Sequence, residues 1–161
     1  MEELSKNKNE LVERLGIHFE KKDHLAPVAA RILAYVILTG KSGTTFEDLV
    51  SNLCASKSTI STHLNHLQDL KKLIYFTKTG DRKKYFIMNR DSMIQDISKM
   101  VEQWEEQKNL HLEIMDYKKA MNEFLSGEEK FDLSFHDSFL EFFNEAIKWV
   151  TKLKETIIKK Y

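Results

Sequence analysis

The sequence predicts a mainly α-helical protein that carries one small β-hairpin. Helix breakers are scarce, because the 161 residues include one proline and five glycines. Apolar residues recur at helical spacing along most of the chain, and one stretch, residues 74–88, has the composition and turn signals of paired strands. The expected order along the chain is therefore helices, one hairpin, and helices again.

Composition narrows the class of protein. Charged residues make up 31% of the chain and hydrophobic residues 42%, as in soluble globular proteins, and this length can bury a core without disulfides or metal. The single cysteine, Cys54, excludes an internal disulfide and suits a reducing compartment. The polar N-terminus and the short apolar run at residues 32–38 predict neither export nor a membrane span. We therefore expect a cytoplasmic protein.

Two helices are expected before residue 40. The apolar residues of the first share one face at a spacing near 3.6, and they are Leu4, Leu11, Val12, Leu15 and Phe19. Pro27 can begin the second helix, and residues 28–38 are apolar on nearly every side. The second helix should therefore be buried, and the first needs a partner for its apolar face.

Residues 44–71 predict two short helices joined by a tight turn. Thr44 followed by Glu47 has the spacing of a capping box and opens a helix to about Leu53. Cys54 and Ala55 form the turn. Ser56 can cap the next helix. The apolar stripe of that helix is expected to comprise Ile60, Leu64, Leu67 and the aliphatic stem of Lys71.

The strand-like residues that follow form a hairpin, with strands at 74–78 and 83–88 and a turn at 79–82. A hairpin directly after a helix-turn-helix is a wing, so the expected fold is a winged helix-turn-helix. Gly80 permits the tight turn. Asp81 is expected to tie the turn through its side chain, because a carboxylate that faced a phosphate would repel it.

Helical spacing returns from Asp91 to about Leu125 and again from about His136, with a linker around residues 126–128. These helices are longer than one compact domain needs. We therefore divide the chain into an N-terminal helix that contributes to a dimer interface (1–25), the winged helix-turn-helix (26–90) and C-terminal dimerisation helices (91–161).

The outer face of the helix that begins near residue 57 carries small polar side chains. On a helical wheel they lie opposite Ile60, with Lys72 beside them, and such side chains let a helix backbone approach base edges in a major groove. A merely solvated face is the alternative. The predicted base-reading residues are Ser56, Lys57, Ser58, Ser61, Thr62 and Asn65.

Charge favours the nucleic-acid interpretation. Residues 56–90 hold eight basic and two acidic side chains, an excess of six positive charges, while the whole chain sums to zero. Such segregation is typical of a phosphate-binding surface. The predicted phosphate contacts are Lys78, Arg82, Lys83 and Lys84, with Arg82 suited to the narrow minor groove. The competing hypothesis is a winged-helix module that binds another protein and no nucleic acid.

Residues 27–88 resemble the winged helix of the MarR superfamily, and most closely its GbsR-like branch. The resemblance rests on PVAARILAY at 27–35, CASKSTISTHL at 54–64 and GDRKKY at 80–85. It implies that the second helix of the motif enters the major groove, that the wing arginine approaches the minor groove, and that terminal helices form a two-fold dimer. The long C-terminal helices with two tryptophans depart from the commoner pattern and leave the effector site open.

Other chemistry finds less support in the sequence. Cys54, His63 and His66 offer donors for a metal, but no second cysteine completes a ligand set. A redox role for Cys54 needs an exposed thiolate, whereas a cysteine in such a turn is usually small and buried. The sequence contains no glycine-rich phosphate loop and no nucleophile elbow. We therefore expect no enzyme, no cofactor and no metal.

Aromatic residues of the C-terminal third offer a second kind of site. They could line a pocket for a small organic effector, although packing in the core or at a dimer interface is the favoured interpretation. The residues concerned are Trp104, Tyr117, Phe139, Phe142, Phe143 and Trp149. The expected partners are thus double-stranded DNA, a second copy of the chain and, as a further candidate, a small-molecule effector.

Overall fold

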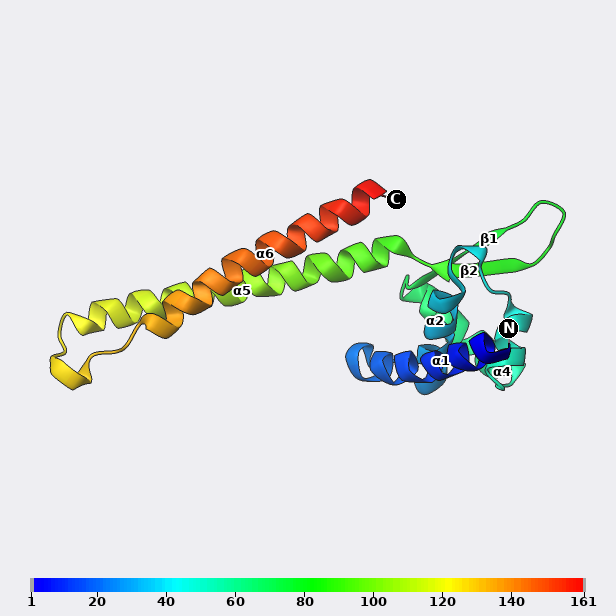
Figure 1. Cartoon of the computed structure of the whole chain (residues 1–161), viewed down its shortest axis with the longest axis horizontal. Coiled ribbons are helices and arrows are strands. Elements are labelled where there is room, and N and C mark those ends of the chain that lie inside the picture. The colour runs from blue at the N-terminus through cyan, green and yellow to red at the C-terminus, as the bar shows by residue number, and fades with distance from the viewer. Residues whose placement is uncertain (1, 161) are drawn as a thin grey trace. The chain divides into compact units, whose positions relative to one another are not determined.

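The computed structural model describes residues 2–160 of the chain (Figure 1). Contacts between residues divide the chain into two units, with the boundary between Ser92 and Met93. The elements in order are α1 (Glu2–Asp23), α2 (Pro27–Thr39), η1 (Gly40–Ser42), α3 (Phe46–Asn52), α4 (Lys57–Asp69), β1 (Leu73–Thr77), β2 (Lys84–Met88), α5 (Arg90–Asn122), η2 (Gly127–Glu129) and α6 (Ser134–Lys160). The predicted fold class, mainly helical with a single hairpin, is confirmed.

Helix α2 lies at the centre of the first unit and packs against α1, α4 and β2. Its buried side chains include Ile32, Leu33 and Val36, as its nearly uniform apolar sequence predicts. Helix α1 contributes Val12 to this core. Burial of aliphatic side chains of this size stabilises the unit by roughly 1.5–3 kcal/mol each.

Ion pairs hold α1 against the rest of the first unit. The guanidinium of Arg31 on α2 reaches the carboxylates of Glu13 at 2.8 Å and Glu20 at 2.7 Å. At the end of α1, Asp23 pairs with Lys72 at 3.0 Å. Helix α1 therefore belongs to the winged unit, and a contribution of residues 1–25 to a dimer remains a prediction.

The start of α3 differs from the prediction by one residue. Thr45 is the N-cap: its hydroxyl accepts from the Asp48 backbone N–H at 3.2 Å, and the Asp48 carboxylate accepts from the Thr45 N–H at 3.0 Å. The predicted pair of Thr44 and Glu47 is wrong. Thr44 cannot serve as the cap because its backbone forms a β-bridge with Phe86, through bonds of 3.0 and 2.8 Å.

Helix α4 begins where the sequence predicts. The Ser56 hydroxyl accepts from the Thr59 backbone N–H at 3.1 Å and caps the helix. The residues that α4 buries are Ile60, Leu64 and Leu67. Lys71 does not extend this stripe, because the helix ends at Asp69 and Lys71 is an exposed residue with a left-handed backbone (φ 56°).

The hairpin pairs antiparallel, from Leu73 opposite Met88 to Thr77 opposite Lys84. The bridge from Thr44 to Phe86 adds a third short stretch of backbone to it. Gly43 permits this close approach, since a Cβ built there would lie 2.8 Å from the Tyr85 Cβ and its φ is +73°. The wing is thereby joined to the segment that enters α3.

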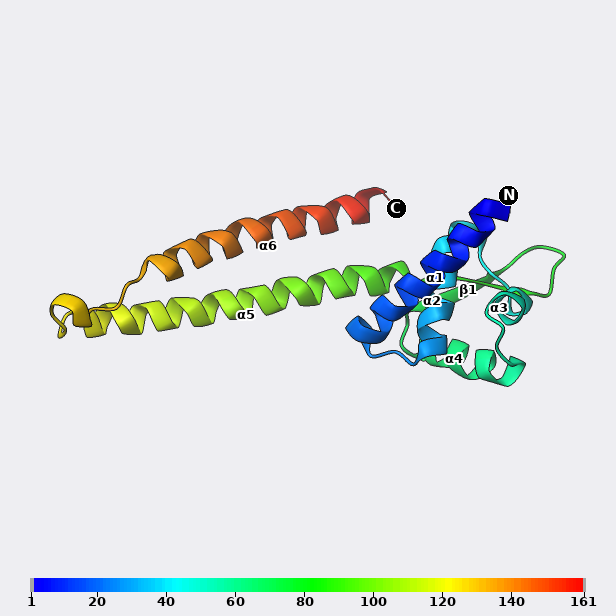
Figure 2. The same ribbon diagram turned by 60° about the horizontal axis from the view of Figure 1, so that its bottom comes forward.

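In the second unit, α5 and α6 run side by side in opposite directions (Figure 1, Figure 2). Met115 of α5 and Phe143 of α6 are buried. Helix α6 begins at Ser134, two residues before the predicted His136, because the Asp132 carboxylate accepts from the Ser134 backbone N–H at 2.9 Å. None of the helices in the described range is long and apolar enough to cross a membrane.

Candidate nucleic-acid interface

The outer face of α4 is exposed, as the helical wheel predicts. Ile60, Leu64 and Leu67 point into the core, so the opposite side of the helix faces solvent. The predicted base-reading residues are all exposed: Ser56, Lys57, Ser58, Ser61, Thr62 and Asn65. Short side chains along this face let an approaching surface come close to the helix backbone.

Hydrogen bonds within α4 limit what some of these side chains can still offer. The Ser56 hydroxyl is engaged as the cap and also lies 2.9 Å from the Ser58 hydroxyl. The Thr62 hydroxyl donates to the Ser58 carbonyl at 3.0 Å, so its lone pairs remain as acceptors. The Gln68 amide donates to Asn65 Oδ1 at 3.4 Å, a long bond that leaves the Asn65 amide group able to donate elsewhere.

The tip of the wing is ordered by Asp81. Its Oδ1 accepts from the Lys83 backbone N–H at 2.9 Å, and its Oδ2 accepts from the Tyr85 hydroxyl at 2.6 Å. These hydrogen bonds, the one from Tyr85 foremost, lower the pKa of the Asp81 carboxyl. Gly80 has a φ of +79° in the turn. The expectation that Asp81 ties the turn is confirmed.

Aromatic rings hold two of the wing lysines, a feature that sequence reasoning missed. The Lys78 ammonium lies 3.7 Å from the centre of the Tyr85 ring, and the Lys84 ammonium lies 4.2 Å from that of Tyr75. Both are cation–π distances. Tyr75 faces Phe86 across the hairpin, so Lys84 is its diagonal neighbour, and this spacing was the signal available in the sequence.

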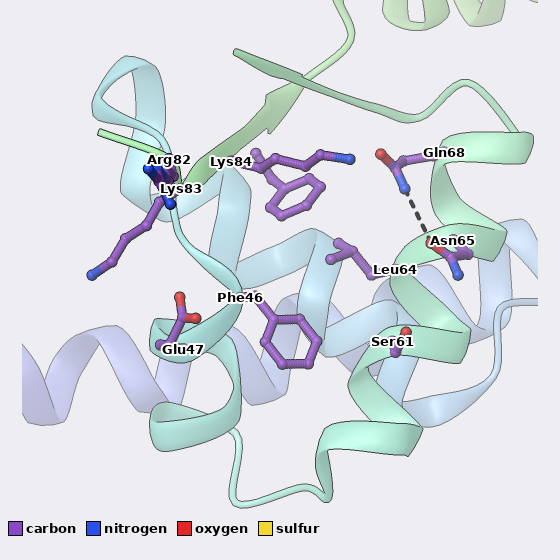
Figure 3. A pocket seen from close by; sticks show the side chains of 10 residues that line it. Phe46, Glu47, Ser61, Leu64, Asn65, Gln68, Arg82, Lys83 and Lys84 are labelled. Atoms are coloured by element: carbon purple, nitrogen blue, oxygen red, sulfur yellow. Dashed lines mark hydrogen bonds between the residues drawn. The ribbon is translucent and has the colours of Figure 1, made fainter. Parts of the chain in front are cut away.

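Helix α4 and the wing meet across a hollow on the first unit. Figure 3 shows the wing side chains Arg82, Lys83 and Lys84 on one side and α4 side chains on the other. Phe46 and Leu64 lie between them. The α4 side chains that line the hollow with Leu64 are Ser61, Asn65 and Gln68. Predicted base-reading residues and predicted phosphate contacts thus border the same surface.

The positive charge of residues 56–90 is less concentrated at this surface than the sequence suggests. Lys72 pairs with Asp23 of α1 and lies where the helix-turn-helix leads into β1. The predicted position of Lys72 beside the polar face of α4 is wrong, because α4 ends at Asp69. The exposed cations that accompany the wing are Lys78, Arg82, Lys83 and Lys84.

The side chains with donors for metal or redox chemistry lie in the helix-turn-helix. Cys54 is exposed and has a φ of 49°, so the expectation of a buried cysteine is wrong; the turn requires a left-handed residue there and points its side chain outward. His63 is half-buried and His66 is exposed. Among residues 2–160, no three His, Cys, Asp or Glu side chains are grouped so that they could hold a metal ion.

Comparison with solved structures supports the fold. A crystal structure described as a transcriptional regulator is 18% identical, covers 95% of this chain and 99% of its own, and superposes with a TM-score of 0.52. Two mutants of MepR from S. aureus are 17% and 18% identical, cover 99% and 97% of this chain and 94% and 93% of their own, and have TM-scores of 0.41. No protein-family model and no curated protein matches the sequence. At these identities the likeness to the first structure shows a shared fold, and function has to be argued from the site.

Proposed function

We propose that this chain is a transcription regulator that binds double-stranded DNA, with α4 in the major groove and the wing at the minor groove. One observation carries the proposal: the exposed polar face of α4 and the wing cations Arg82, Lys83 and Lys84 border the same hollow. Small polar side chains can meet base edges while lysine and arginine contact the flanking phosphates. The fold shared with a transcriptional regulator supports this assignment.

We further infer a regulator of the MarR type, and within it the GbsR-like branch, acting in the cytoplasm. The sequence motifs at 27–35, 54–64 and 80–85 support the assignment. The mainly helical fold with one wing agrees with it.

The active form in this proposal is a homodimer. Large apolar side chains stay exposed on α5 and α6, among them Tyr117 (64%), Phe142 (57%) and Trp149 (61%). Soluble monomers rarely expose this much apolar surface, and a second copy would cover it. A two-fold dimer presents two α4 helices and therefore reads an inverted repeat.

A small organic effector remains a prediction from the sequence. Of the six aromatic residues considered for it, Phe142 and Trp149 line one open hollow on α6, together with Glu141 and Glu145. The phenylalanines Phe139 and Phe143 pack instead around His111. Two acidic side chains beside two aromatic ones would suit a cationic ligand better than an anionic one.

Selection of duplexes from a random library by the full chain tests the proposal. The recovered sequences should contain two inverted half-sites whose centres lie about one helical turn, roughly 10 base pairs, or a multiple of it apart. Asn65→Ala should weaken binding to the selected duplex by roughly 1–3 kcal/mol and leave binding to random duplex nearly unchanged. Asn144→Ala, at an exposed site on α6, is the matched control.

Two results would contradict the proposal in different ways. Equal losses of affinity for selected and random duplexes in Asn65→Ala would make Asn65 a phosphate-proximal residue and would rotate α4 about its axis. Recovery of no preferred sequence, with no affinity for any duplex, would favour the protein-interaction module.

A further inference from the structure

A buried histidine in the second unit has both of its ring nitrogens engaged. His136 lies in the first turn of α6 and is 4% exposed. Its Nε2 is 3.0 Å from the ammonium of Lys118, and its Nδ1 is 3.3 Å from Nδ1 of His111. Lys118 and His111 both lie on α5, so the three side chains connect the two helices of this unit.

The chemistry of these three groups fixes where the protons are. An ammonium can only donate, so Nε2 of His136 must accept from Lys118 and carry no proton. Neutral His136 then has its proton on Nδ1 and donates it to Nδ1 of His111. His111 accepts through that nitrogen and is neutral as well. The chain of hydrogen bonds therefore runs in one direction, from Lys118 through His136 to His111.

One added proton cannot be accommodated in this arrangement. A proton on Nε2 of His136 would replace the bond from Lys118 with two cations facing each other. A proton on Nδ1 of His111 would force His136 into its other tautomer, and Nε2 would then turn an N–H toward the ammonium. Either event removes the hydrogen bond between Lys118 and His136 and leaves donors of like charge about 3 Å apart.

The surroundings make such a charge costly. The His111 ring packs against the rings of Phe139, Phe143 and Phe135, at centroid distances of 4.6, 6.1 and 6.2 Å. Aromatic side chains offer an added proton no hydrogen-bond acceptor in place of water.

Few charged groups bear on His136. From α5 they are Lys118 and His111, and from α6 the Asp137 carboxylate, which acts in the opposite direction. The carboxylate of Asp132, in the segment before α6, is engaged by Ser134. Lys118 also lies 5.4 Å from the centre of the Phe131 ring in that segment, so its release would loosen the connection as well.

We propose that Lys118, His136 and His111 form a proton-sensitive contact that joins α5 to α6 near neutral pH and opens on mild acidification. The proposal does not depend on DNA binding. Burial, and after it the charge of Lys118, lower the pKa of His136 from its ordinary value of 6.5. Because the folded state binds this proton less readily than the unfolded state, the contact stabilises the unit above about pH 6.5, and that stabilisation declines as the pH falls below it.

The chain contains a convenient reporter for this unit. Both tryptophans, Trp104 and Trp149, lie beyond the boundary at residue 92, so tryptophan emission follows the second unit alone. Urea unfolding of the full chain, followed by this emission at fixed protein concentration, should give a lower midpoint at about pH 5.5 than at about pH 7.5.

Three variants separate this contact from the other titrating groups. His136→Gln keeps one donor and one acceptor without titrating, so the midpoint should become nearly independent of pH. Lys118→Met removes the neighbouring cation, so the fall in the midpoint should begin at a higher pH. His66→Gln removes an exposed histidine of α4 in the first unit and should behave as the unchanged protein does.

Histidine NMR signals of the unchanged chain give a test that needs no variant to fold. Signals of two histidines should titrate together below about pH 6.5, and both should shift in Lys118→Met. The proposal is overturned if the urea midpoint does not change between the two pH values, if His136→Gln retains the full pH dependence, or if all six histidines titrate near their ordinary pKa of 6.5.

Discussion

Tyr85 governs the charge at the tip of the wing through two different parts of its side chain. Its hydroxyl donates to Asp81 at 2.6 Å, and its ring lies under the Lys78 ammonium at 3.7 Å. The hydroxyl thus holds a carboxylate in place beside cations that the proposed function assigns to DNA phosphates. Without it, Asp81 would be free to pair with Arg82 or Lys83 and to neutralise them.

Tyr85→Phe removes the hydroxyl and keeps the ring. We expect this change to weaken binding to every duplex roughly 2- to 10-fold, the range of one hydrogen bond, as measured by fluorescence anisotropy at low salt. Adding Asp81→Asn should restore binding, because the freed group no longer carries charge. Tyr75→Phe, whose ring holds Lys84, is the matched control. A weakened binding that Asp81→Asn does not restore would mean that the hydroxyl acts on something other than Asp81.

Helix α4 depends on its cap more than on its composition. The run from Lys57 to Asp69 contains several serines, threonines and asparagines, which are mediocre helix formers. The Ser56 hydroxyl accepts from the Thr59 backbone N–H and satisfies one of the free donors at the first turn. The polar residues that suit DNA contact thus reduce the intrinsic stability of the helix that carries them.

Ser56→Ala should lower the free energy of unfolding by about 1 kcal/mol, within a range of about 0.5–2 kcal/mol. Urea unfolding followed by far-ultraviolet circular dichroism measures this decrease. Ser61→Ala, an exposed position in the middle of the same helix, should change the free energy by less than about 0.5 kcal/mol. If the two substitutions have the same effect, the cap contributes nothing beyond helix propensity.

Most elements could be predicted because their signals are local. The apolar spacing of α4, its cap at Ser56 and the turn at Gly80 each depend on residues close together in sequence. The start of α3 could not be predicted, since Thr44 and Thr45 are equivalent as sequence. The choice between them is made by a backbone bridge from Thr44 to Phe86, forty-two residues away.

The candidate site was predictable to a similar degree. The exposed face of α4 and the wing cations follow from the helical wheel and from local charge. The pairing of Lys72 with Asp23 joins segments far apart in sequence, and counting charges along the chain could not reveal it. Cys54 was misjudged because its left-handed backbone, and not its apolar character, decides where its side chain points.

The chain as a whole separates two kinds of surface. The first unit carries the exposed polar and cationic side chains of α4 and the wing. The second unit carries exposed aromatic and aliphatic side chains along α5 and α6 and the proton-sensitive contact between them. A balance of 25 basic and 25 acidic residues therefore hides a strong local asymmetry. In the proposed function the cationic surface binds DNA and the apolar surface binds a second copy.

DNA binding by α4 and the wing is tested most sharply by the affinity of the full chain for random duplex DNA as a function of salt concentration. Binding of lysine or arginine to phosphates releases counterions, so the logarithm of the binding constant should fall linearly with the logarithm of the salt concentration. Arg82→Ala should reduce the slope by roughly 0.9 for each phosphate that the arginine neutralises. Lys148→Ala, which removes an exposed cation of α6, should leave the slope unchanged. Absence of duplex binding at low salt, or a slope that neither substitution alters, would contradict DNA binding by this surface.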